Sequence, residues 1–108
     1  MIYSLGELKR IIEPIANKYA IPVVYLFGSY ARGEATDSSD VDILIDREGS
    51  AIRGLFDLGA LYNDLNEILG KPVDLVTIDS IVQPETQRRT PWFAKMLEQE
   101  RIVIYERH

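Results

Sequence analysis

Two residue groups in the N-terminal half of the chain have the types and spacing for phosphate and metal chemistry. Gly28 and Ser29 are followed, after a spacer of ten residues, by Asp40 and Asp42, which are one residue apart. A glycine allows close approach of the backbone, and backbone N–H groups with a serine hydroxyl can hold a phosphate. Carboxylates supply the oxygen ligands that magnesium and manganese prefer. The pattern therefore predicts a site for a phosphate and a divalent cation.

Local patterns place these residues at the ends of strands. The apolar run 23–27 predicts a buried strand that ends at Gly28, followed by a helical turn over 30–33. A second strand is expected over about 40–46. Its alternation places Val41, Ile43 and Ile45 on one face, and Asp40, Asp42, Leu44 and Asp46 on the other. Residues two apart on a strand are separated by roughly 6 to 7 Å at their Cα atoms, so both carboxylates can reach one ion.

A third carboxylate lies in the apolar run 73–77, which predicts another strand. Asp74 is the one charged residue of that run. If this strand lies beside the second, Asp74 arrives next to Asp40 and Asp42. Such a group of carboxylates repels itself unless a cation is present, so a metal is the simplest reason to gather them.

Helices and one edge strand are expected to support these strands. The Ser4-x-x-Glu7 capping box opens a helix, in which Pro14 predicts a kink or a division into two pieces. A longer helix, ended by Gly70 and Pro72, presents one wide apolar face: Ile52, Leu55, Phe56, Leu58, Leu61, Tyr62, Leu65, Ile68 and Leu69. Another helix begins at Thr90 and Pro91 and buries Trp92, Phe93, Met96 and Leu97, and 102–105 form a last strand, at the sheet edge.

Composition narrows the class of protein. The chain has 108 residues, of which 46% are hydrophobic, and this fits one domain spanning 1–108. No run is long and apolar enough for a membrane span, and no secretion signal precedes the first helix, so a cytoplasmic location is expected. The absence of cysteine excludes thiolate sites, and the formal charge of −5 argues against a broad nucleic-acid surface.

The stretch GSYARGEATDSSDVD, from Gly28 to Asp42, resembles the GS-x10-DxD signature of the polymerase-β-like nucleotidyltransferase superfamily. The later VDLVT resembles the strand that carries the third acidic residue of that superfamily. Nearly the whole chain is covered, and its small size resembles minimal nucleotidyltransferases, many of which are antitoxins paired with HEPN-type ribonuclease toxins. The resemblance implies an α/β (α+β) fold, with helices packed on a small mixed sheet.

The resemblance also implies a reaction and roles for individual residues. Gly28 and Ser29 would hold the triphosphate of ATP, to which the sequence itself adds Arg32 as a candidate nucleotide-binding residue. Asp40, Asp42 and Asp74 would bind two magnesium ions, or manganese, with Asp74 also acting as the base. The reaction would transfer AMP to a hydroxyl, which in the antitoxin branch resembles a tyrosine of the partner toxin. An added nucleotide would repel RNA from a ribonuclease site.

Most of these residues also have a purely structural interpretation. Gly28 and Ser29 could form a turn with Ser29 as the N-cap, Asp40 could cap a loop, and Asp42 could be a solvated strand residue. Arg32 could bind phosphate or pair with Glu34 or Asp37. Other polar residues have their own alternatives: Tyr30 could pack or line the nucleotide pocket, Asp46 could simply end its strand, Arg88 and Arg89 could form a solvated or partner-facing patch, and His108 is expected to be disordered.

Two further functions stay open beside protein modification. The chain could be a binding module that neutralises a toxin by covering it, with a vestigial or regulatory site. It could also be a stand-alone transferase for a small hydroxylated metabolite, although so short a chain offers little room for an acceptor pocket. A homo- or hetero-oligomer fits the small size and the expected edge strand.

Overall fold

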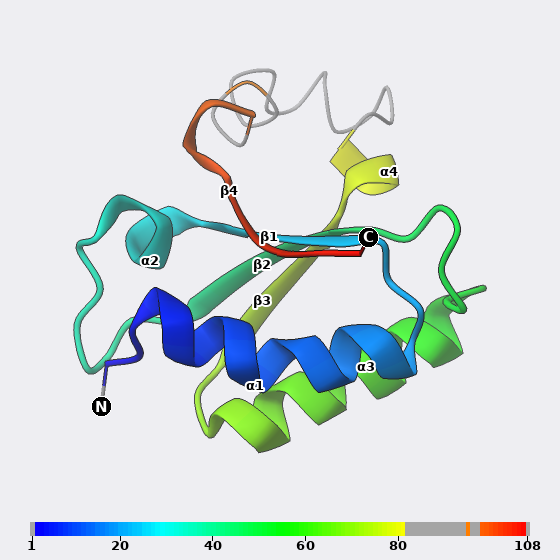
Figure 1. Cartoon of the computed structure of the whole chain (residues 1–108), viewed down its shortest axis with the longest axis horizontal. Coiled ribbons are helices and arrows are strands. Elements are labelled where there is room, and N and C mark those ends of the chain that lie inside the picture. The colour runs from blue at the N-terminus through cyan, green and yellow to red at the C-terminus, as the bar shows by residue number, and fades with distance from the viewer. Residues whose placement is uncertain (1, 82–94, 96–97, 108) are drawn as a thin grey trace.

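A mixed four-stranded sheet carries two long helices on one of its faces in the computed structural model, which describes residues 2–81, 95 and 98–107 (Figure 1). The elements are α1 (Leu5–Lys18), β1 (Val23–Phe27), α2 (Gly28–Arg32), β2 (Val41–Asp46), α3 (Leu55–Leu69), β3 (Val73–Thr77), α4 (Ile78–Ile81) and β4 (Ile102–Glu106). The strand order is β3-β2-β1-β4, with β2 and β3 parallel and the other pairs antiparallel. The predicted class, helices packed on a small mixed sheet, is confirmed.

The helix expected over residues 90–97, with Trp92, Phe93, Met96 and Leu97, lies outside the residues described, apart from Lys95, which is helical. The predictions for Arg88, Arg89 and His108 also fall outside them. No helix among the described residues is long and apolar enough to cross a membrane.

Helix α1 begins as the sequence predicts and continues through its proline. Ser4 Oγ accepts a hydrogen bond from the Glu7 N–H at 3.1 Å, and Glu7 Oε1 accepts one from the Ser4 N–H at 2.9 Å, which completes the capping box. Of the two alternatives expected at Pro14, a kink or a division, the division is wrong, because α1 is one helix of 14 residues. Pro14 is exposed and so is Arg10, whose carbonyl loses its partner, so solvent can satisfy that carbonyl.

The strands divide their side chains between two faces of the sheet. Val41, Ile43 and Ile45 of β2 belong to the core beneath α1 and α3. Leu44 points the other way and packs with Phe27 in a smaller apolar cluster. The predicted alternation is therefore confirmed, with one change at its start: β2 begins at Val41, so Asp40 precedes the strand.

Helix α3 buries a narrower stripe than the sequence suggests. Leu61, Leu65 and Leu69, four residues apart, face the core, and the helix ends at Gly70, whose φ of 63° is left-handed. The wide buried face is wrong at four predicted positions: Leu55, Phe56, Tyr62 and Ile68 are exposed. One helix face about 100° wide is enough to cover the sheet, and the flanking apolar residues point outward.

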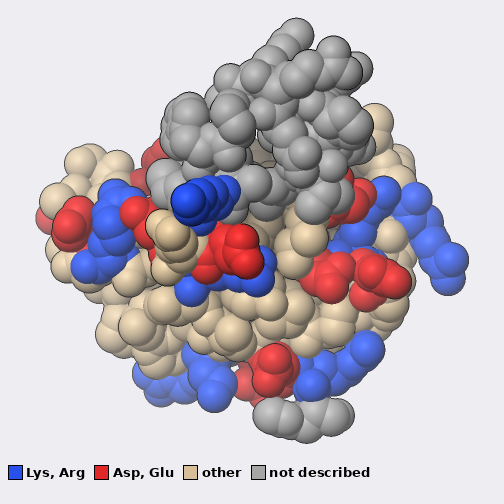
Figure 2. All heavy atoms as spheres, turned by 90° about the horizontal axis from the view of Figure 1, so that it is seen from above, with Lys and Arg blue, Asp and Glu red and all other residues tan. Residues whose placement is uncertain are grey.

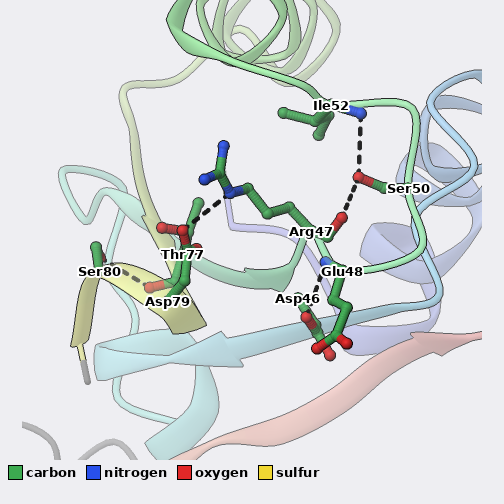
Figure 3. A network of polar contacts seen from close by, with 8 residues as sticks. All are labelled: Asp46, Arg47, Glu48, Ser50, Ile52, Thr77, Asp79 and Ser80. Carbon is green, nitrogen blue, oxygen red and sulfur yellow. Dashed lines mark hydrogen bonds and ion pairs between the residues drawn. The ribbon is translucent and has the colours of Figure 1, made fainter. Parts of the chain in front are cut away.

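A polar network ties the ends of the two parallel strands together (Figure 3). Arg47 follows β2, and its Nε donates to Oδ2 of Asp79 in α4 at 2.9 Å. Ser50 Oγ donates to the Arg47 carbonyl at 2.6 Å and so shapes the same loop. Helix α4 follows β3 directly and is not foreseen from the sequence. The network therefore supports the register of β2 on β3.

Candidate active site

The Gly28-Ser29 pair forms the junction between β1 and α2. Gly28 is the first residue of α2 and has a φ of +70°, a conformation that side chains other than glycine rarely adopt. A Cβ atom at Gly28 would overlap Oδ2 of Asp42, so the glycine also makes room for that carboxylate. Ser29 follows as the second residue of α2, so its hydroxyl lies in the first turn of that helix. The structure therefore places the first half of the sequence pattern directly against the second.

Two of the three predicted carboxylates occupy paired positions on neighbouring strands. Asp42 of β2 is the register partner of Asp74 of β3, and neighbouring strands lie roughly 4.7 to 4.9 Å apart. Asp42 is half-buried, and Asp74 is exposed. Asp42 also faces Phe27, the last residue of β1. The site therefore lies where β1 ends and the two parallel strands begin.

Burial and like charge change the ionisation of Asp42. Desolvation is the largest cause that raises the pKa of Asp42, followed by the negative charges of Asp74 and Asp40, and together they raise it to about 6 against an ordinary value of 3.8. The positive charge of Arg32 acts in the opposite direction. Burial and the two neighbouring acids thus outweigh the effect of Arg32 on the Asp42 carboxylate.

The donor set fits a hard divalent cation, because it consists of carboxylates, whose oxygens such cations prefer. The three acids do not form a ready three-ligand cluster, however: in the part of the chain that the structure describes, no three acidic or histidine side chains converge closely enough for a metal. Asp42 and Asp74 are adjacent, whereas Asp40 is exposed in the loop just before β2. Mutual repulsion opposes closer approach of the carboxylates.

Arg32 lies one turn after Gly28, at the end of α2. Its Nε donates to Glu34 Oε2 at 3.2 Å, the pairing that the sequence offers as an alternative to phosphate binding. Its Nη1 donates to Glu100 Oε2, also at 3.2 Å. Sequence reasoning missed Glu100, and no local signal could have found it, since the two residues are 68 positions apart.

Tyr30 belongs to the main core, and it also lines the inner side of a surface pocket beside α2. Its ring is buried in the main core between the sheet and the helices. Its hydroxyl accepts hydrogen bonds from Lys71 Nζ at 3.0 Å and from the Tyr3 N–H at 3.4 Å. Of the two alternatives for Tyr30, the structure supports packing. Asp46 accepts a hydrogen bond from the Glu48 N–H at 3.0 Å, as a residue at the end of a strand does.

The face of the sheet that bears the carboxylates carries charges of both signs. Figure 2 looks at this side from above, and acidic and basic side chains are interspersed over the described part of the surface. No broad basic surface of the kind that nucleic-acid binding needs is seen in the described part of this view.

Comparisons with known proteins identify the family of this chain. The model of the nucleotidyltransferase domain family matches residues 8–104. A Methanocaldococcus jannaschii protein named as a candidate protein adenylyltransferase is 44% identical over 79 residues, which cover 72% of this chain and 82% of that protein. The protein adenylyltransferase MntA of Thermococcus cleftensis is 37% identical over 82 residues, covering 72% of this chain and 81% of the relative.

A solved structure described as the toxin–antitoxin with AMP-PNP has the same fold. It superposes with a TM-score of 0.69 at 20% identity and covers 93% of this chain and 74% of its own. The resemblance read from Gly28 to Asp42 is thereby confirmed. This chain belongs to the nucleotidyltransferase domain family.

Proposed function

We propose that this protein is a metal-dependent adenylyltransferase that transfers AMP from ATP to a hydroxyl of a partner protein. The observation that carries the proposal is the register pairing of Asp42 with Asp74, with Gly28 packed against the Asp42 carboxylate. Carboxylates packed this closely cost stability when they are unneutralised, and a site for cations gives a reason to retain them.

Each residue has a distinct task in this reaction. Asp40 and Asp42 would hold two magnesium ions, for which manganese could substitute, and Asp74 would complete the site beside the acceptor. Bound there, the ions would neutralise phosphate charge and stabilise the attacking and leaving oxygens. Asp74 is exposed and can take the proton of an incoming hydroxyl. The hydroxyl oxygen then bonds to the α-phosphorus as the bond to the β-phosphate oxygen breaks, and pyrophosphate leaves.

The phosphates of ATP fall to the residues around the β1–α2 junction. Gly28 packs against the Asp42 carboxylate, Ser29 follows it in α2, and Arg32 offers a guanidinium one turn later. A guanidinium binds phosphate oxygens through two parallel hydrogen bonds, which fixes their orientation.

A protein hydroxyl is the proposed acceptor, specifically a tyrosine of a HEPN-type ribonuclease toxin for which this chain is the antitoxin. Two curated relatives carry the name protein adenylyltransferase, and a structure of the same fold is described as a toxin–antitoxin with AMP-PNP. The acceptor side of the site is open, because Asp74 is exposed, and this suits a bulky substrate. ATP and magnesium are both supplied by the cytoplasm, where we place the reaction.

Intact-mass spectrometry on the protein with its co-purified partner tests the proposal. With ATP and magnesium the partner should gain whole AMP units, and peptide mapping should place them on tyrosine. Asp42→Asn and Asp74→Asn should lower the rate by roughly 10²-fold or more, the usual effect of losing a group that stabilises transition-state charge. Asp46→Asn is the matched control, since it removes the same charge from the same strand at the strand's far end. Full activity in the Asp42→Asn protein would refute the assignment.

A second candidate is an antitoxin that acts by covering its toxin, with a vestigial nucleotidyltransferase site. The observation that favours it is the outward-facing pair Leu55 and Phe56, exposed to 88% and 91%, because large exposed apolar side chains often mark protein contacts. A variant with Asp40, Asp42 and Asp74 all changed to alanine separates the two functions. Full protection against the toxin by this variant would favour covering, and loss of protection with the complex intact would favour transfer.

A further inference from the structure

A short segment before β4 carries an acid that pairs with Arg32. Residues 98–100 are helical, and Glu100 Oε2 accepts the hydrogen bond from Arg32 Nη1 at 3.2 Å. Glu34 holds the Nε of the same guanidinium, but the Glu34 side chain is 67% exposed and the Glu100 side chain is 30% exposed. Glu100 is therefore the better shielded of the two partners, and its pairing is the less screened by solvent.

The position of Glu100 is fixed by the sheet. Ile102 begins β4 and pairs with Leu26 of β1, and this register fixes where the preceding residues lie relative to β1. Arg101 stands between Glu100 and Ile102 in the sequence. Its guanidinium lies over the Tyr25 ring at 4.5 Å from the centroid, a cation–π contact that also ties this part of the chain to β1. The position of Glu100 beside Arg32 is thus fixed by the contacts of the two residues that follow it.

Arg32 stands close to the carboxylates and to the residues assigned to the phosphates. It ends the short helix that Gly28 and Ser29 begin, and its charge acts directly on Asp42. Two of its donors, Nε and Nη1, are already engaged by carboxylates. A phosphate that binds Arg32 through the edge of the guanidinium must take donors from one or both of these acids.

We propose that Glu100 competes with the phosphates of the nucleotide for Arg32 and so weakens nucleotide binding in the resting protein. The inference rests on the proposed function, because it assumes that the nucleotide reaches Arg32. Binding then exchanges a carboxylate for a phosphate on Arg32 and releases Glu100 from the guanidinium. Glu100 lies two residues before β4, so the segment 98–101 is tied to Arg32 when the site is empty and loses this contact when nucleotide is bound.

Nucleotide affinity, measured by isothermal titration with AMP-PNP and magnesium, tests this competition. Glu100→Gln keeps the shape of the side chain and removes its charge, and it should lower the Kd roughly 2- to 5-fold, the size that the loss of one exposed ion pair allows. Glu98→Gln is the matched control, since Glu98 is an exposed acid in the same segment and lies outside the pairing with Arg32. Its Kd should stay within the error of the wild-type value.

A double-mutant cycle separates competition from a general charge effect. In an Arg32→Ala background the Glu100→Gln change should no longer alter the Kd, because its partner is gone. An equal gain in affinity with and without Arg32, or no gain in the single variant, overturns the inference. If the wild-type protein binds no nucleotide, the inference falls together with the proposed function. If it binds and transfers AMP but is indifferent to Glu100, the inference alone falls.

Discussion

At the scale of single residues, the site is built at the expense of local stability, and Gly28 illustrates this. Its φ of +70° and its contact with Asp42 leave no room for a side chain. Gly28→Ala should therefore destabilise the fold by more than about 1 kcal/mol. It should also lower transfer by roughly 10²-fold, because a displaced carboxylate loses its alignment. Urea unfolding and the rate of AMP transfer check the two effects.

Gly59 provides the opposite case within the same chain. It lies inside α3 and is exposed, and a Cβ atom there would meet nothing within 4 Å. Gly59→Ala should stabilise the protein by about 0.5 to 1 kcal/mol, since alanine restricts the unfolded chain more than glycine does. Transfer should be unchanged. A loss of activity in this variant equal to that of Gly28→Ala would show that the effect at Gly28 is not specific to the site.

Asp42 should make the stability of the metal-free protein depend on pH. Its pKa in the folded protein, about 6, lies above the ordinary value of 3.8, so the folded state favours the protonated form. The stabilisation is fully present below about pH 4 and is lost as the pH rises through 6. The asparagine of Asp42→Asn does not titrate, so the urea midpoint of this variant should rise relative to that of the wild type between pH 4 and pH 7.5.

Magnesium should offset the loss of stability that the wild type shows at high pH relative to Asp42→Asn, because the cation neutralises the charged carboxylate. At pH 7.5 magnesium should raise the midpoint of the wild type and leave that of Asp42→Asn nearly unchanged. Parallel pH profiles of the two metal-free proteins would contradict the role of Asp42 in this dependence.

At the scale of elements, local patterns predicted what local forces decide. The capping box placed the start of α1, and the apolar runs gave β1 and β3 with the bounds that the structure has. Local patterns did not predict how narrow the buried face of α3 is, because that depends on which part of the helix the sheet covers. They also did not predict the short helix α4. The Glu100 pairing with Arg32 is likewise set by the approach of β4 to β1.

The contact between α1 and α3 gives a prediction at this scale. Asp64 of α3 accepts hydrogen bonds from the Tyr19 hydroxyl at 2.6 Å and from Lys18 Nζ at 2.9 Å, both at the end of α1. The hydrogen bond from Tyr19, followed by that from Lys18, lowers the pKa of Asp64 below 3.8. Its contribution to stability is therefore present above about pH 4 and lost as the pH falls further.

Asp64→Asn should lower the urea midpoint at pH 7, and the difference from the wild type should shrink towards pH 3. Glu67→Gln, an exposed acid on the same helix, is the control and should show little change at either pH. A deficit in Asp64→Asn that is equal at both pH values would point to a cause other than the carboxylate charge.

At the scale of the whole molecule, the sheet separates stability from chemistry. Helices α1 and α3 cover one face and hold the main core, whereas the other face carries Asp42 and Asp74 (Figure 1). The connection through α3 makes β2 and β3 parallel neighbours and so brings two acids 32 positions apart into register. The residues alone gave this pairing only on the condition that the two strands are neighbours, because no local pattern dictates which strands lie side by side.

The same separation predicts that apolar residues of α3 differ sharply in what they contribute. Leu61 is buried beneath the sheet, and Leu61→Ala should cost about 2 to 5 kcal/mol by leaving a cavity. Phe56 is exposed to 91%, so Phe56→Ala should change the free energy of unfolding by no more than about 0.5 kcal/mol, although it removes the larger side chain. Urea unfolding of the isolated protein measures both. A cost of several kcal/mol at Phe56 would mean that the ring is covered in solution, and a dependence of that cost on protein concentration would identify a second copy of the chain as the cover.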